Sequence, residues 1–264
     1  MEKKITIKTK DGIKLVGLWR CVHKKSAKAV ILAHGITVDK EEEGMFSQLA
    51  EILAKKEEIA SFRFDFRGHG ESRGRQEDMT ISGEIKDLTA VYLEVQKKGF
   101  KRIGIVGSSF GGGITVLTAK EFGEDVKAIC LWNPVLNFKN TFINPFLPWL
   151  KNDITRMKNE LKNQGRTYIP VENPHRIGRQ LFEEMEKIEP YRHLGNIRAS
   201  VLIIHGDRDS YVPYKYSVKY LDSFKDWKKL LTIQGADHGF SGERAEEYKK
   251  QAYRATLEFF RKFL

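Results

Sequence analysis

The sequence has little cysteine and no long apolar run, and these two absences exclude whole classes of protein. Cys21 and Cys130 are the only cysteines among 264 residues, and both lie in segments typical of strands. We therefore interpret them as small buried apolar residues rather than as a disulfide. No apolar run is long enough to cross a bilayer, so stable membrane insertion is not expected. Residues 1–8 lack the apolar core of a secretory signal, which predicts a cytoplasmic protein or one already cut to its mature form.

The chain also lacks a basic stripe interleaved with aromatic residues, although its formal net charge is +11. Nucleic-acid binding is therefore not expected. Much of the excess charge lies where helices are predicted to end, at residues 55–56, 97–98 and 261–262, and would complement the negative end of a helix dipole. Mild steering of anionic ligands stays open. No two histidines have the spacing of metal ligands, and the sequence implies no metal and no cofactor.

What the sequence does contain is the composition of a soluble globular protein, with 41% hydrophobic and 31% charged residues. Its length suits one α/β domain that carries an insertion. Two short strands within residues 3–21 are joined at Asp11-Gly12, a dipeptide suited to a tight hairpin. Continuous apolar runs, typical of parallel strands covered on both faces, follow at residues 29–33, 59–66, 102–106, 127–132, 201–204 and 230–233.

Helical spacing appears between these runs. Apolar residues at helical intervals within 45–53 and 85–95 each share one face, and residues 243–264 form a last helix. Because strands and helices alternate, we predict an α/β fold with a mostly parallel twisted sheet flanked by helices.

One stretch interrupts this alternation. Residues 134–194 carry several prolines and aromatic residues, show no obvious buried strand, and are too many for a simple loop. We predict that they form an inserted cap over one end of the sheet, with residues 1–133 and 195–264 forming the core.

The strongest chemical signal is Gly107-Ser108-Ser109-Phe110-Gly111. It follows the predicted strand that ends at Val106 and precedes the helical segment 112–119, which is the context of a G-x-S-x-G nucleophile turn. The alternative is a glycine-rich turn that binds phosphate, but the Lys-Ser or Lys-Thr pair of a P-loop is missing. We predict that Ser109 is a nucleophile, which requires a base and a third group to orient that base.

Four motifs in order resemble those of the α/β-hydrolase family over nearly the whole chain. They are His34-Gly35, the segment 64–72 (FDFRGHGES), the segment 107–111, and a downstream pair formed by residues 205–213 (HGDRDSYVP) and 235–240 (GADHGF). The order of nucleophile, acid and histidine is that of this family. The resemblance implies an α/β-hydrolase fold and a serine hydrolase activity.

The resemblance also assigns the partners of Ser109. The family pattern H-G-x-x-D-x-x-V-P places the acid at Asp209 and makes Asp207 the less favoured candidate, a turn residue. Asp237 is interpreted as a solvated loop carboxylate. The base is His238, the one histidine after the final strand with the flanking glycines of the family.

The other histidines are assigned to structural or surface positions. His34 and His205, which end buried strands, are interpreted as structural residues bonded to nearby backbone. His23, His69, His175 and His193 are interpreted as loop or surface residues.

Negative charge that develops on the substrate oxygen needs two donors, and the backbone N–H groups of Ile36 and Phe110 are predicted to supply them. The segment His34-Gly35-Ile36-Thr37 lacks the further glycines of the hormone-sensitive-lipase branch, which disfavours that branch.

The cap resembles the inserted subdomain of bacterial feruloyl or cinnamoyl esterases, through residues 165–170 (GRTYIP) and 177–182 (IGRQLF). Four aromatic side chains, Phe138, Phe142, Trp149 and Tyr168, are predicted to line an acyl pocket, the alternative being that they form the cap's own core. The predicted partner is a small-molecule ester. Formation of a homodimer with a second copy of the chain also stays open.

Three functions follow as hypotheses. The first is a carboxylesterase acting on aryl or short-to-medium acyl esters, with feruloyl or cinnamoyl esters as the specific case. The second is a monoacylglycerol lipase, in which residues 142–149 (FINPFLPW) form an apolar flap. The third is a non-catalytic α/β-hydrolase used as a binding module. Peptidase activity also stays open, because the same three residues can cleave amides.

Overall fold

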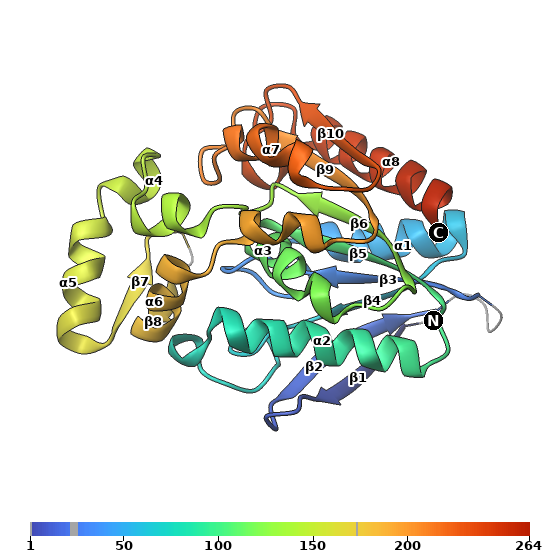
Figure 1. Ribbon diagram of the computed structural model, residues 1–264, viewed down its shortest axis with the longest axis horizontal. Coiled ribbons are helices and arrows are strands. Elements are labelled where there is room, and N and C mark those ends of the chain that lie inside the picture. The colour runs from blue at the N-terminus through green and yellow to red at the C-terminus, as the bar shows by residue number, and fades with distance from the viewer. Residues whose placement is uncertain (1, 22–25, 173) are drawn as a thin grey trace.

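The computed structural model describes residues 2–21, 26–172 and 174–264 and is built around one large sheet (Figure 1). The sheet has eight strands in the order β1-β2-β4-β3-β5-β6-β9-β10. Strands β1 and β2 form an antiparallel hairpin, β2 pairs antiparallel with β4, and the remaining neighbours are parallel. The bounds are β1 Glu2–Lys8, β2 Lys14–Arg20, β3 Lys28–Ala33, β4 Ala60–Phe64, β5 Arg102–Ser108, β6 Val126–Trp132, β9 Ser200–Gly206 and β10 Lys228–Ile233.

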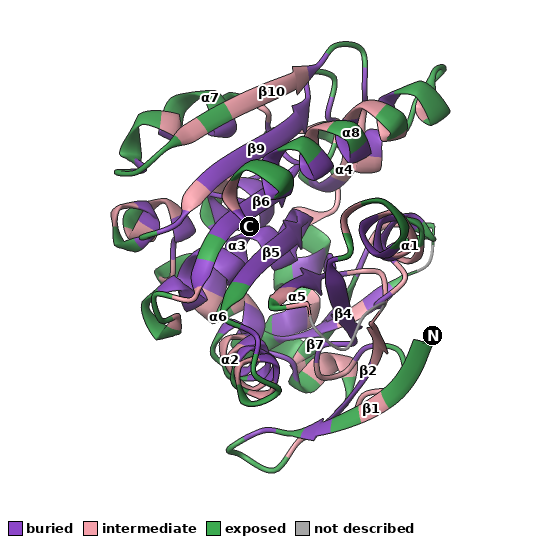
Figure 2. Cartoon of the chain, turned by 90° about the vertical axis from the view of Figure 1, so that its right-hand side faces the viewer, coloured by how far each residue is buried: buried purple, intermediate pink, exposed green. Residues whose placement is uncertain are grey.

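Helices cover both faces of this sheet, which explains the continuous apolar runs. In β3, Val30 and Leu32 pack against helices α1 (Met45–Glu57) and α8 (Ala245–Phe263). The alternate residue Ile31 packs on the other face, with α2 (Ile81–Lys97) and α3 (Ser109–Thr118). Because successive side chains of a strand point to opposite faces, a strand covered on both sides must be apolar throughout. Figure 2 shows the result, with β5 and β9 largely buried and the edge strands β1 and β10 partly exposed.

The predicted mostly parallel α/β fold is therefore confirmed, with differences at the element ends. Helix α3 begins at Ser109, three residues before the predicted helical segment. Cys130 is buried in β6 as predicted, whereas Cys21 follows β2 and is half-buried.

Parallel pairing brings the strand ends that carry the motifs to one edge. Ala33 of β3 pairs with Gly107 of β5, and Trp132 of β6 pairs with Ser108 of β5 and with Ile204 of β9. The segments that follow β3, β5 and β9 therefore leave the sheet at the same edge, with the end of β6 between those of β5 and β9.

Residues 134–194 contain more regular structure than their sequence indicates. They include α4 (Pro148–Lys151), α5 (Ile154–Gln164), α6 (Arg179–Lys187) and an antiparallel strand pair, β7 (Arg166–Ile169) with β8 (His175–Gly178). Figure 1 shows these elements gathered at one end of the molecule. The short pair was not predicted, because four residues are too few to establish a strand period. The division into core and cap stays a prediction, since buried apolar residues of this stretch belong to the same hydrophobic cluster as the sheet.

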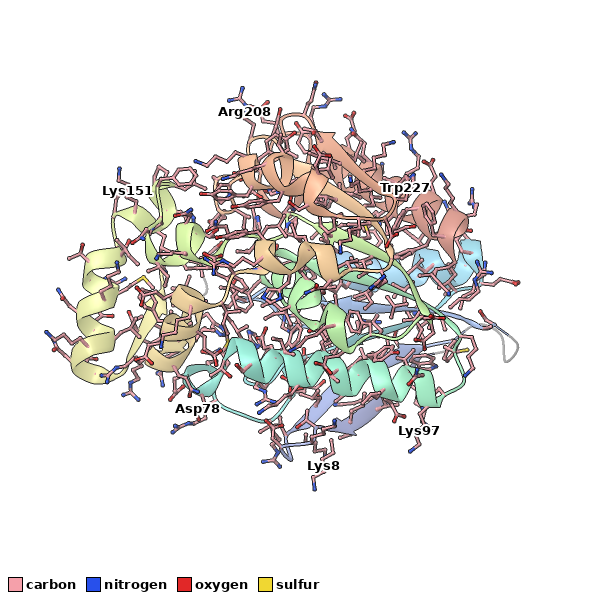
Figure 3. All side chains as sticks on the ribbon, in the orientation of Figure 1. Lys8, Asp78, Lys97, Lys151, Arg208 and Trp227 are labelled. Carbon is pink, nitrogen blue, oxygen red and sulfur yellow. The ribbon has the colours of Figure 1, made fainter. Side chains whose placement is uncertain are left out.

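The basic residues are spread over the surface. Lysines or arginines occupy the last turns of α1, α2 and α8, as predicted from the helix dipole. In Figure 3 the labelled side chains of Lys8, Lys97, Lys151 and Arg208 extend outward from different parts of the outline. Among the helices that the structure describes, none combines the length and the apolar composition needed to span a bilayer. Helix α7 (Lys215–Tyr220) lies in the connection between β9 and β10.

Candidate active site

Ser109 lies at the sharp turn between β5 and α3. Its φ of 49° is in the left-handed region, which few residues other than glycine adopt. The turn is so tight that side chains on Gly107 and Gly111 would clash: a Cβ on Gly107 would lie 2.5 Å from Thr115 Oγ1, and one on Gly111 2.3 Å from the carbonyl oxygen of His34. The two glycines of the motif therefore permit the strained turn that presents the Ser109 hydroxyl.

His238 approaches Ser109 from the loop after β10. Its Nε2 lies 3.1 Å from Ser109 Oγ, and its Nδ1 lies 2.8 Å from Asp209 Oδ2. Because an ionised carboxylate only accepts, the Nδ1 atom carries the proton and Nε2 is left to accept from the serine hydroxyl. The structure thus brings the three predicted residues into one chain of hydrogen bonds.

Asp209 is buried and held by donors on all sides. Its Oδ1 accepts from the backbone N–H groups of Tyr211 and Val212 at 2.9 and 2.7 Å, and its Oδ2 lies 3.1 Å from Nε2 of His205. Burial alone would raise the pKa of Asp209, but the charge of His238 and the hydrogen bonds from both histidines hold that pKa below its ordinary value. The carboxylate therefore stays ionised beside the imidazole.

The electrostatic effect on His238 is reciprocal. Burial opposes its protonation, whereas the charge of Asp209 and the hydrogen bond to it favour protonation, and the pKa of His238 ends above its ordinary value.

The two other aspartates considered from sequence have different positions. Asp207 accepts a hydrogen bond from the backbone N–H of Gly235 at 2.7 Å and fits the predicted turn role. Asp237 is a half-exposed loop carboxylate that does not contact the His238 ring, but it is bonded to protein groups as well as facing solvent. It accepts from the backbone N–H and hydroxyl of Ser210 and from the backbone N–H of His238, so it ties the loop of Asp209 to the loop of His238.

The predicted donors Ile36 and Phe110 flank Ser109. Phe110 is the second residue of α3, and N–H groups in the first turn of a helix have no partner within the helix. The peptide bond between Gly35 and Ile36 carries the Ile36 N–H. Its carbonyl oxygen, on Gly35, lies 2.7 Å from Nδ1 of His34, so the His34 ring helps to orient this peptide. Among the described residues this N–H has no backbone partner. His34 also accepts from the backbone N–H of Phe66 at 3.0 Å, which fixes its ring as predicted.

A pocket of about 400 Å³ opens above Ser109 and His238. Phe142 and Trp149 line it together with Tyr211, whose ring contacts both Trp149 and His238. Phe138 and Tyr168 are not among its lining residues, contrary to prediction. Phe138 is fully buried behind Phe110, with ring centroids 4.8 Å apart.

Tyr168 is on the outer face of β7. Its neighbours Thr167 and Ile169 point to the buried face of the strand, so Tyr168 points outward and is 43% exposed. Its hydroxyl accepts a hydrogen bond from Arg176.

Two of the histidines interpreted as loop or surface residues are buried, although His69 does lie in a loop, whereas His175 begins β8. His69 and His175 are each 4% exposed and stack with ring centroids 4.6 Å apart, and Nε2 of His69 lies 2.7 Å from the carbonyl oxygen of Ile36. His193 is half-buried, and His23 lies outside the described residues. His205 is buried and contacts Ser217 and Asp209, and its Nε2 also lies 3.3 Å from the carbonyl oxygen of Val212, the kind of backbone partner that was predicted.

Sequence reasoning missed Tyr211 and Glu42. Tyr211 lies within the motif that carries Asp209, so its position could have been inferred. Glu42 belongs to the acidic run Glu41-Glu42-Glu43, which resembles solvated surface, yet its side chain is buried beside Ser108. Among the described residues no cluster of histidine, cysteine or acidic side chains could hold a metal ion.

A family model described as "Serine aminopeptidase, S33" matches residues 24–245. The chain belongs to this family. The predicted resemblance to the α/β-hydrolases is thereby confirmed, and the fold is that of an α/β-hydrolase.

Relatives and solved structures agree with this membership. A Mycoplasma genitalium protein named provisionally as an esterase/lipase is 26% identical over 232 residues, which are 81% of this chain and 84% of that protein. The human monoacylglycerol lipase ABHD6 is 28% identical over 71% of this chain and 62% of its own length.

The structure of Est1E from Butyrivibrio proteoclasticus with bound ferulic acid matches with a TM-score of 0.78. It is 26% identical and covers 97% of this chain and 99% of its own. Together the family and these names support a hydrolase of the esterase/lipase type.

Proposed function

We propose that this protein is a serine carboxylester hydrolase, with Ser109 as nucleophile, His238 as base and Asp209 as the residue that orients the base. The observation that carries the proposal is the unbroken series of hydrogen bonds from Asp209 through His238 to Ser109, which ends in the pocket. A serine hydroxyl is a weak nucleophile without such a base.

The reaction follows from these positions in two halves. His238 Nε2 takes the Ser109 proton while Oγ forms a bond to the ester carbon, and the carbonyl oxygen becomes an oxyanion facing the N–H groups of Ile36 and Phe110. Collapse of this intermediate breaks the bond to the alcohol oxygen, which receives the proton from His238. Water then attacks the acyl carbon and gives a proton to His238. The bond between that carbon and Ser109 Oγ breaks, Oγ takes the proton back from His238, and the acid leaves.

The pocket favours aryl or short-to-medium acyl groups. Phe142, Trp149 and Tyr211 form a series of contacting rings, and the Trp149 indole N–H donates to the carbonyl oxygen of Tyr211 at 2.9 Å, which fixes the indole plane. Flat rings pack well against such a wall. The ferulic acid bound in the Est1E structure makes feruloyl or cinnamoyl esters the specific form of this proposal.

The test is a panel of p-nitrophenyl acyl esters beside methyl ferulate, with Ser109→Ala as the control. We expect the unmodified protein to hydrolyse esters and the Ser109→Ala variant to lose this activity. A fluorophosphonate should label Ser109 in the unmodified protein and should not label the variant. A protein that hydrolyses no ester and takes no label would support the binding-module alternative. Turnover of octanoyl esters with no turnover of ferulate esters would overturn the feruloyl form. An aminoacyl p-nitroanilide in the same panel measures amide cleavage.

The second candidate, a monoacylglycerol lipase, is favoured by one observation besides the similarity to ABHD6. Phe146 is 41% exposed and lies in sequence between the pocket residues Phe142 and Trp149, so this segment carries an apolar ring that is partly open to solvent and partly covered by Lys215. A lipase would show a sharp rise in rate on monoacylglycerol above its micelle concentration, and Phe146→Ser would remove that rise while leaving hydrolysis of monomeric esters.

A further inference from the structure

Glu42 is buried, and it is among the residues that line the pocket with Ser109 and His238. The residue is 6% exposed. Its Oε2 accepts from the backbone N–H of Gly35 at 2.9 Å, and its Oε1 accepts from the hydroxyl of Ser108 at 2.7 Å. One carboxyl group therefore joins the segment after β3 to the end of β5.

The backbone that delivers this side chain is strained. Glu42 and Glu43 have φ values of 46° and 54°, and Gly44 follows at 88°. Two consecutive non-glycine residues in the left-handed region are uncommon, and such strain persists where surrounding contacts over-determine it. Hydrogen bonds from the Glu42 N–H to the Asp39 carbonyl and from the Met45 N–H to the Glu42 carbonyl hold the turn.

The two segments joined by Glu42 are those that carry the proposed oxyanion donors. Gly35 immediately precedes Ile36, and Ser108 precedes Ser109 and Phe110. We infer that Glu42 is a positioning residue, which sets the distance between the Ile36 and Phe110 N–H groups and so the fit of the site to the transition state. This inference rests on the proposed function. Displacement of a reacting group by about 1 Å costs on the order of 100-fold in rate, so a brace at this point affects kcat.

The bridging geometry is compatible with either protonation state of Glu42. An ionised carboxyl accepts both hydrogen bonds, and a protonated one donates from Oε1 to Ser108 Oγ while Oε2 still accepts from Gly35. Burial raises the pKa of Glu42 to about 7, although the hydrogen bonds from Ser108 and Gly35 lower it. Of the nearby charged groups, His238 lowers this pKa and Glu43 raises it. When it is ionised, Glu42 in turn raises the pKa of His238.

The experiment compares kcat, KM and the pH profile of ester hydrolysis in four variants. Glu42→Gln keeps an acceptor for Gly35 and a donor toward Ser108 but cannot ionise. Glu42→Ala removes both links, and Ser108→Ala removes one. Glu41→Ala is the matched control, because Glu41 is the adjacent carboxylate and binds Arg63 instead. Thermal melting reports the folding of each variant.

We expect Glu42→Ala to lose kcat by about 100-fold with a far smaller change in KM. Glu42→Gln should retain most of kcat, and Ser108→Ala should fall between the two. Removal of the negative charge lowers the pKa of His238, so the acid limb of kcat/KM in Glu42→Gln should move to lower pH, a change that a purely structural residue would not produce. Glu41→Ala should match the unmodified protein in kcat and in the acid limb.

Full kcat in folded Glu42→Ala would overturn the inference, as would a Glu42→Gln variant impaired as strongly as Glu42→Ala with an unmoved acid limb. Either result, with hydrolysis still dependent on Ser109, leaves the proposed function intact. If the unmodified protein hydrolyses no ester, the proposed function fails and this inference fails with it.

Discussion

Asp209 contacts two histidines and two backbone amides, so a single carboxylate fixes four neighbours. The sequence predicts this residue from a motif of nine residues, 205–213, because the acid and the Val-Pro pair after it lie close together in the chain and directly follow an apolar strand. Ser109 and His238 were predicted for the same reason. Glu42, His69 and His175 were not, because burial of a polar side chain depends on segments that meet only in the folded chain.

The choice between Asp209 and Asp207 gives a matched pair of variants. We predict that Asp209→Asn lowers kcat by about 10³ to 10⁴-fold, because an amide stabilises neither the correct tautomer of His238 nor its protonated form. Asp207→Asn should retain nearly full activity. Steady-state kinetics on one p-nitrophenyl ester measures both, and equal losses in the two variants would contradict the assignment.

The raised pKa of His238 predicts the direction of the pH dependence. The imidazole must be neutral to accept the Ser109 proton, so kcat/KM should rise with pH through the pKa of His238 in the free protein. Because Asp209 favours the protonated form, that midpoint should lie above the ordinary histidine value of about 6.5. A profile on an ester that does not ionise measures it, and a midpoint below 6.5 would count against the role of Asp209.

At the scale of elements, the long strands were predictable and the short ones were not. The run Ala29–Ala33 is apolar on both faces, which identified β3 as a buried parallel strand. In β7 the alternation covers only four residues, too few to distinguish a strand from an irregular segment. This explains the misassignment of Tyr168, whose exposed direction is fixed by the strand that the sequence did not indicate.

The packing of α3 against the end of β3 predicts an unusual response to a helix substitution. Alanine normally stabilises a helix relative to glycine by about 1 kcal/mol. At Gly111, however, the added Cβ would lie 2.3 Å from the His34 carbonyl oxygen. We predict that Gly111→Ala lowers the melting temperature by roughly 2–10 °C. Gly195→Ala, where the nearest atom is at 3.5 Å on a lysine side chain, is the control and should change it little.

At the scale of the whole molecule, residues 134–194 and the sheet share one hydrophobic cluster. Leu181 and Met185 of α6 are buried in the same cluster as Ile105 of β5 and Phe110 of α3. Glu184 of α6 also accepts hydrogen bonds from the backbone and hydroxyl of Ser82 on α2. The sequence indicated a cap from the missing alternation, the length of the stretch and a family resemblance, but none of these signals shows how closely the stretch packs on the rest of the chain.

A shared cluster predicts cooperative unfolding. Leu181→Ala should destabilise the protein by about 2–5 kcal/mol, since it leaves a cavity in the common core. Denaturant unfolding followed by far-ultraviolet circular dichroism and by tryptophan fluorescence should show coincident midpoints in this variant as in the parent. Leu93→Ala, at a site 41% exposed, is the control with a far smaller loss. Separate transitions in the two signals would show that the cap unfolds independently.

The strand order has a consequence for how the protein is made on the ribosome. Ser109 directly follows β5, near the centre of the sheet, whereas Asp209 and His238 follow β9 and β10, which are added last at one margin. A nascent chain can therefore pair β3, β4, β5 and β6 while Asp209 and His238 are still unsynthesised. If the proposed function holds, we expect the growing polypeptide to hydrolyse no ester until His238 has left the ribosome and β10 has joined the sheet.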